Sequence, residues 1–91
     1  MTFRQVIREA AEQADLTTAD RVRLRMVMRF RPTRLEQEIL NQAQVEGIVP
    51  ASLTLAAINS ADATAQIDWA ALAEFIKEVL PAILQIISLF L

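Results

Sequence analysis

The chain has 91 residues, a length that fits one small domain with a modest core. It contains neither cysteine nor histidine, which excludes disulfide frameworks, thiol nucleophiles, imidazole catalysis and nearly all zinc or copper sites. Apolar residues make up 54% and charged residues 22%, so the composition is not that of a disordered chain, and the single glycine favours long regular elements. We expect no enzyme and no cofactor or metal.

The net charge of −2 is distributed unevenly. Residues 1–34 hold eight arginines against four carboxylates, a net charge of +4, whereas residues 35–91 hold one lysine against seven carboxylates, a net charge of −6. A basic N-terminal part and an acidic C-terminal part attract each other within one chain or between copies. The split is therefore as compatible with self-assembly as with an external anion.

The N-terminus runs straight into an amphipathic segment, without the apolar stretch of a secretory signal peptide. We therefore expect the cytoplasm, or a virion assembled there, and no secretion by a signal peptide.

Capping signals and helical spacing predict two helices in the first 30 residues. Thr2 and Gln5 have capping-box spacing, and the apolar residues that follow recur at helical intervals, which predicts a helix from residue 3 to about residue 14. The segment Asp15–Thr18 breaks this helix. Thr17 and Asp20 have the same capping spacing, so a second helix is expected from about residue 18 to residue 30.

The second segment also carries a conflicting signal, because apolar residues and arginines alternate from Arg21 to Arg31. A period of two residues is typical of a strand. Leucine, methionine and arginine favour a helix, a cap precedes the run, and no strand with similar alternation lies nearby. We favour the helix and keep the strand as the alternative.

Pro32 ends the second segment, and Thr33 with Glu36 predicts the cap of a third helix that runs to about Glu46. Gly47 stands where a left-handed C-cap is expected, and Pro50 prevents the helix from continuing. Residues 1–49 are thus expected to form a helical, arginine-rich N-terminal domain.

Residues 50–66 are mostly small and polar, which predicts a linker that docks through Leu53, Leu55 and Ile58. A short strand over residues 52–58 is the alternative. Residues 67–91 then form the third part of the chain.

The C-terminal segment predicts a long helix whose apolar surface must be buried against protein or lipid. Asp68 is a good N-cap, and 17 of the 23 residues from Trp69 to Leu91 are apolar. The polar residues gather in one narrow stripe, and Pro81 within it predicts a kink. Leaving half of the wide apolar arc in water costs on the order of ten kcal/mol, so we expect it to be covered on several sides.

The fold class that these segments predict is all-α, a small bundle of three short helices with a long, kinked, apolar C-terminal helix. The arc expected to form an assembly interface consists of Trp69, Leu72, Phe75, Ile76, Val79, Leu80, Ile83, Ile86, Ile87, Phe90 and Leu91.

Membrane contact is the alternative for this helix. The uncharged run from Val79 to Leu91 has 13 residues, whereas a span needs about 20, so a single span is not expected. An interfacial helix usually carries lysine and arginine on its polar face, and here that face is net acidic. A ring of copies with the polar stripe turned inward could still make a pore.

The second polar feature is a cluster of arginines. Its members are Arg21, Arg23, Arg25, Arg29, Arg31 and Arg34. Such a cluster could neutralise phosphates of nucleic acid, but no base-reading motif, second basic stretch or interleaved aromatic residue accompanies it. We favour a solvated face, or one paired with Glu36, Glu38 and Glu46 of the same or a neighbouring copy, over an interface to an acidic protein.

No catalytic constellation stands out. Glu74 and Glu78 lie one helical turn apart, as paired carboxylates do, but no second helix supplies similar groups. We interpret them as the wet edge of an amphipathic helix, with Lys77 as an ion-pair partner.

The tail Ile67-Asp68-Trp69-Ala70-Ala71-Leu72, followed by Phe75-Ile76, Leu80-Pro81 and Ile83 to Phe90, resembles the endings of short, uncharacterised proteins of tailed phages and related bacterial genomes. The resemblance covers residues 67–91 and brings no catalytic residues. It implies a small virion or phage-assembly component.

We therefore expect a structural or assembly protein that self-associates, or docks on a larger complex, through its C-terminal helix. The partners expected are further copies of the chain or a larger protein assembly. A membrane-active protein of the holin or pore type is the first alternative, and a nucleic-acid-associated protein that uses the arginine-rich segment is the second.

Overall fold

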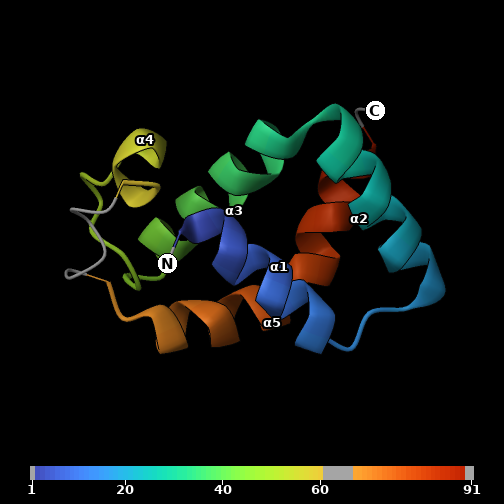
Figure 1. Cartoon of the computed structure of the whole chain (residues 1–91), viewed down its shortest axis with the longest axis horizontal. Coiled ribbons are helices and arrows are strands. Elements are labelled where there is room, and N and C mark those ends of the chain that lie inside the picture. Colours follow the sequence, from blue (N-terminus) through green and yellow to red (C-terminus); the bar gives the residue numbers. More distant parts are fainter. Residues whose placement is uncertain (1, 61–66, 90–91) are drawn as a thin grey trace.

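The computed structural model describes residues 2–60 and 67–89, and within them all regular structure is helical (Figure 1). The helices are α1 (Phe3–Gln13), α2 (Thr18–Phe30), α3 (Pro32–Val45), α4 (Leu55–Ile58) and α5 (Trp69–Ser88). The predicted all-α class is confirmed. The alternating segment after Arg21 is a helix, because capping and helix-forming residues outweigh the period-two pattern.

Three predicted caps are confirmed by hydrogen bonds. The backbone N–H of Gln5 donates to the Thr2 hydroxyl over 3.3 Å, and the Thr2 N–H donates to Gln5 Oε1 over 2.8 Å, so both halves of the capping box form. Thr17 Oγ1 accepts the N–H of Asp20 over 3.1 Å at the start of α2. The Asp68 carboxylate accepts the N–H of Ala71 over 3.1 Å and caps α5 in the same way. Each cap satisfies an N–H group that the first helical turn leaves without a partner.

The predicted cap of the third helix at Thr33 is wrong. The N-cap lies two residues earlier, at Arg31, so α3 begins at Pro32, and Arg31 makes no side-chain capping bond. Proline suits this first position because its ring fixes φ near the helical value and its missing N–H would have no partner in the helix anyway. The short link through Arg31 therefore lets α3 start directly after α2.

The C-terminal end of α3 confirms the glycine cap. Gly47 has a φ of +74°, a left-handed conformation that disfavours residues with a Cβ. The N–H of Ile48 donates to the carbonyl of Ala43 over 2.9 Å, and the Gly47 N–H donates to the backbone carbonyl of Gln44 over 3.1 Å. These two bonds form a Schellman motif, which satisfies the last carbonyls of α3 and turns the chain away from the helix axis.

The segment after this turn contains the short helix α4, so the alternative of a strand over residues 52–58 is wrong. The Thr54 hydroxyl accepts the N–H of Ala57 over 3.1 Å and starts a helical turn instead. The predicted docking is confirmed, because Ile58 is buried and Leu53 and Leu55 pack partly buried against the core. The predicted linker also included residues 61–66, which lie outside the described residues.

The side-chain amide of Gln44 holds the start of this segment against α3. Its Nε2 donates to the carbonyls of Pro50, Ala51 and Leu53 over 3.2, 3.3 and 2.7 Å. The Pro50 carbonyl also accepts the N–H of Leu53 over 3.1 Å, so the Gln44 side chain and one turn bond together satisfy this stretch of loop backbone.

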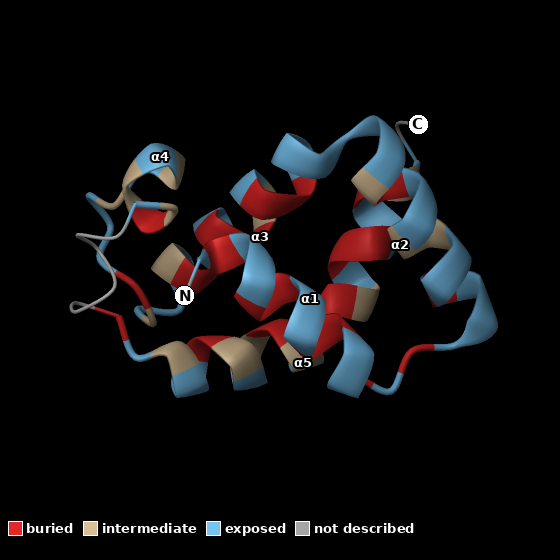
Figure 2. Cartoon of the chain, in the orientation of Figure 1, coloured by how far each residue is buried: buried red, intermediate tan, exposed pale blue. Residues whose placement is uncertain are grey.

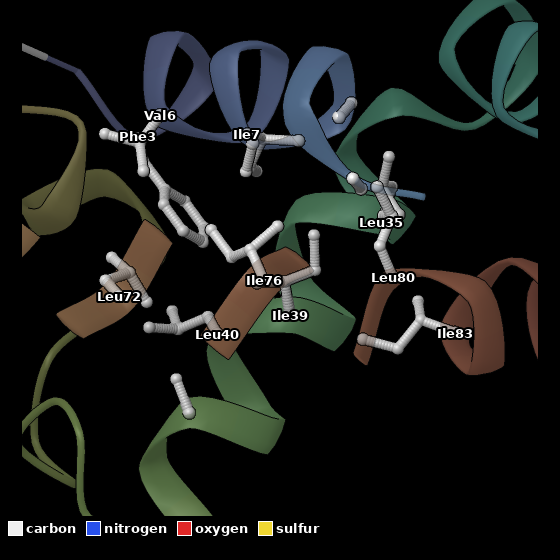
Figure 3. Close-up of a cluster of buried hydrophobic side chains, with 14 of the residues drawn as sticks. Phe3, Val6, Ile7, Leu35, Ile39, Leu40, Leu72, Ile76, Leu80 and Ile83 are labelled. Carbon is white, nitrogen blue, oxygen red and sulfur yellow. The ribbon is translucent and has the colours of Figure 1, made fainter. Parts of the chain in front are cut away.

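Helix α5 contacts α1, α2 and α3, and its inner side lies at the centre of the core (Figures 1 and 2). Its fully buried side chains are Leu72, Ile76, Leu80, Ile83, Leu84 and Ile87. Figure 3 shows side chains of α1, α3 and α5 pointing into one space, with Phe3, Ile39 and Ile76 among them. Pro81 lies inside α5, and the kink expected there stays a prediction.

Ile76 tests this packing directly, because its side chain is fully buried. We expect Ile76→Ala to lower the free energy of unfolding by about 2–5 kcal/mol, since the cavity would be lined by three helices that cannot easily collapse into it. The control is Val45→Ala, a change at a side chain that is 82% exposed, which should alter stability by less than about 0.5 kcal/mol. Urea unfolding followed by circular dichroism measures both. Equal effects of the two substitutions would show that Ile76 does not lie in the core.

Candidate docking surface

The structure divides the predicted assembly arc of α5 into three groups. Leu72, Ile76, Leu80, Ile83 and Ile87 are buried by the chain's own helices. Trp69, Phe75 and Val79 are partly buried against the core, and Ile86 is exposed. The two remaining members, Phe90 and Leu91, lie outside the described residues. The chain itself thus covers most of the arc, and a partner meeting α5 would find its outer residues only.

Most of the exposed large apolar residues of the described chain lie on two segments. Six large apolar side chains are exposed, and five of them lie on α2 and at the C-terminal end of α5. These five are Val22 (47% exposed), Met26 (43%), Phe30 (61%), Ile86 (45%) and Leu89 (81%). Val22, Met26 and Phe30 are spaced by four residues, so they form one stripe along the outer side of α2. Figure 2 shows this side of α2 as exposed.

A stripe of arginines runs beside the apolar stripe. Arg21, Arg25 and Arg29 are exposed and also spaced by four residues, one position before each apolar member. The Arg29 guanidinium lies 5.5 Å from the centre of the Phe30 ring, a cation–π distance that links the two stripes. Arg31 and Arg34, at the end of α2 and the start of α3, are exposed as well.

Most of these arginines have no counter-charge within the described part of the chain. Of the cluster, Arg23 alone forms an ion pair there, with Asp20 over 3.1 Å. Glu36, a predicted counter-charge, instead binds Arg4 of α1. The two other predicted partners, Glu38 and Glu46, form no ion pair among the described residues. The arginine stripe is thus a solvated face in the isolated chain.

Arg23 connects the two apolar groups. Its side chain lines a shallow depression together with residues from the C-terminal half of α5, including Ile86 and Leu89. Arg23 is the residue of α2 that lines this depression, so α2 and the end of α5 meet there. We group the stripes of α2 with the end of α5 as the α2–α5 surface, whose members are Arg21, Val22, Arg23, Arg25, Met26, Arg29, Phe30, Ile86 and Leu89.

The acidic residues of α5 that were interpreted as the wet edge of the helix are exposed. Lys77 Nζ binds Glu74 Oε1 over 2.8 Å, and Glu78 is exposed one turn further on. Nowhere in residues 2–60 and 67–89 do three acidic side chains gather as the ligands of a metal ion would.

A second polar feature links α1 to α3. Arg4 Nε donates to Glu36 Oε1 over 2.9 Å, and the Glu36 side chain is only 5% exposed. The other carboxylate oxygen, Oε2, has no hydrogen-bond partner. The pair borders a depression of about 160 Å³ that Arg8 and Met28 also line. Ligand pockets usually measure about 300–1,000 Å³, so we interpret the pair as a structural link between helices.

The sequence interpretation missed the apolar half of the α2–α5 surface. It noted the arginines of the α2 segment but gave Val22, Met26 and Phe30 no outward role. A signal was present in the sequence. At about 100° per residue, Leu24, Val27 and Met28 fall on one side of the helix and Val22, Met26 and Phe30 on the other, which is more apolar surface than one core contact needs.

Comparisons with family models, curated proteins and solved structures found no match to this chain.

The ion pair of Arg4 and Glu36 generates a stability prediction. Arg4→Ala leaves a buried carboxylate without its cationic partner, so we expect the free energy of unfolding to fall by about 1–3 kcal/mol. Glu36→Gln removes the charge and keeps the shape, and should cost less. Arg8→Ala is the matched control, because Arg8 is exposed in the same helix and forms no ion pair among the described residues. Urea unfolding that ranks Arg4→Ala with Arg8→Ala would rule out a stabilising role for the pair.

Proposed function

We propose that this chain is a non-enzymatic structural protein that is built into a larger assembly by docking its α2–α5 surface on protein neighbours. One observation supports this most. Five of the six large apolar side chains exposed in the described chain lie on that surface, beside arginines without counter-charges. A grouping of exposed apolar residues with a charged border is typical of a protein interface.

The residue types favour a protein partner over nucleic acid. All basic residues of the surface are arginines, and the chain's single lysine lies elsewhere, on α5. Arginine, methionine and aromatic residues are enriched at protein interfaces, and lysine is depleted there. The net charge of −2 would repel a polyanion at long range, and Phe30 is the one aromatic residue of the surface available to stack on a base.

The residue pattern also favours a protein partner over a bilayer. Among residues 2–60 and 67–89, none of the helices is both long and apolar enough for a membrane span. An interfacial helix buries a wide apolar face in the lipid. The inner side of α2 packs in the bundle through Val27, which leaves a narrow stripe of three apolar residues for contact with a partner.

In this proposal α5 has two roles. Its inner side holds the bundle together, and its outer end adds Ile86 and Leu89 to the docking surface. A small virion or phage-assembly component, as the C-terminal resemblance implies, would use such a surface to take its place among neighbouring subunits.

A photo-crosslinking experiment in cells that naturally produce the protein tests this proposal. A benzophenone amino acid replaces Met26 in the surface, and in a control variant it replaces Val45, which is 82% exposed on α3. We expect the Met26 variant to give a covalent adduct with a protein of discrete mass, and the Val45 variant to give no such adduct.

Three other outcomes would count against a protein-docking role. An adduct with lipid would favour the membrane-active alternative, and an adduct with nucleic acid would favour the second alternative. Equal, diffuse labelling at Met26 and Val45 would show that the α2–α5 surface has no specific partner.

A further inference from the structure

Helix α5 carries a charge pattern that complements the one on α2. Glu74 and Glu78 are exposed and four residues apart, as Arg25 and Arg29 are on α2. Four residues of an α-helix rise about 6 Å, so the spacing of the two carboxylates along α5 equals the spacing of the two guanidinium groups along α2. The Glu74 carboxylate also binds Lys77 over 2.8 Å, whereas Glu78 forms no ion pair in the described chain.

Each acidic residue of α5 is followed by an apolar residue on the neighbouring stripe. Phe75 follows Glu74 and Val79 follows Glu78, and both apolar side chains are only partly buried. Ala82 and Ile86 continue this stripe as exposed residues towards the end of the helix. The outer side of α5 thus has an acidic stripe beside an apolar one, where α2 has a basic stripe beside an apolar one.

The order of the stripes sets the direction in which two such helices can pair. On both helices the charged residue comes one position before its apolar neighbour, so the stripes follow in the same rotational sense. Viewed from outside with the N-terminus at the bottom, both helices therefore carry the charged stripe on the same side of the apolar stripe. When two such helices face each other in parallel, the charged stripe of each lies opposite the apolar stripe of the other. An antiparallel arrangement places charge opposite charge and apolar opposite apolar.

We infer that the partner of the α2 stripes is a second copy of this chain, whose α5 packs antiparallel against α2. In this register Arg25 lies opposite Glu78, and Arg29 lies opposite Glu74. The inference rests on the proposed docking function and names its partner. The exposed arginines without counter-charges then pair with carboxylates of another copy, as expected from the basic N-terminal part and the acidic C-terminal part of the chain.

The contact joins two different helices, which determines the assemblies it can build. It closes into a two-fold dimer when both copies pair α2 with the other copy's α5 at the same time. It grows into a longer oligomer when each copy uses its two helices on two neighbours. Both assemblies depend on the same two charge pairs, so the same substitutions disrupt either one.

The test uses the purified full-length chain and its mass in solution, measured by light scattering over a range of concentrations. One variant carries Arg25→Glu with Arg29→Glu, and a second carries Glu74→Arg with Glu78→Arg. Like charges would face each other in each variant alone, so we expect association to weaken about tenfold or more. Mixing the two variants, or combining all four changes in one chain, should restore association, because opposite charges face each other again.

The control is Glu9→Arg with Asp15→Arg, the same change of charge at two exposed residues of α1 and the turn after it, outside the surface, which should leave association unchanged. The neutral pairs Arg25→Gln with Arg29→Gln and Glu74→Gln with Glu78→Gln repeat the test without repulsion, and circular dichroism checks that every variant keeps its helices.

Two outcomes would overturn the inference. A wild-type chain that stays monomeric at every concentration does not bind a second copy. The proposed docking function would then depend on a different protein, the one that crosslinks to position Met26. An oligomer that persists in both charge-reversed variants would show that the copies meet elsewhere.

Discussion

The structure depends above all on keeping water away from the inner side of α5. Its six buried large side chains are each worth about 1.5–3 kcal/mol of burial, a sum comparable to the net stability of a whole small domain. Helices α1, α2 and α3 all contact this helix, and the core that they share extends to Ile58 of α4. A fold of 91 residues without disulfides has few other ways to stabilise itself.

Covering α5 from within the chain determines what remains for function. The inner residues of α2, among them the fully buried Val27, are used in the core, so only its outer side can meet a partner. That side combines a narrow apolar stripe with arginines that the described chain does not neutralise. The proposed docking role follows from this division, in which the inner side of α5 provides stability and the outer side of α2, with the outer end of α5, provides recognition.

Signals that act over a few residues predicted much of the fold. The caps at Thr2, Thr17 and Asp68 and the turn at Gly47 depend on neighbouring atoms, and the structure contains all of them. The start of α3 was predicted wrongly, because Thr33 has the spacing of an N-cap while the helix in fact begins at Pro32 without a side-chain cap.

The width of the apolar arc on α5 predicted that this arc must be covered, but periodicity cannot say whether the covering residues belong to the same chain or to another. For that reason residues such as Leu72 and Ile76, assigned to an assembly interface from the sequence, lie in the chain's own core. The sequence shows two apolar sides on α2, but which of them stays exposed depends on the positions of the other helices.

Amide hydrogen exchange along α5, followed as the protein is diluted, tests most directly whether the chain covers this helix by itself. If α1, α2 and α3 bury its inner side, the slow exchange of the amides around Ile76, Leu80 and Ile83 should stay the same from concentrated to highly dilute samples, because an intramolecular contact does not depend on concentration. Protection that disappears on dilution would contradict this account and would show that other copies of the chain, and not its own helices, keep α5 from water.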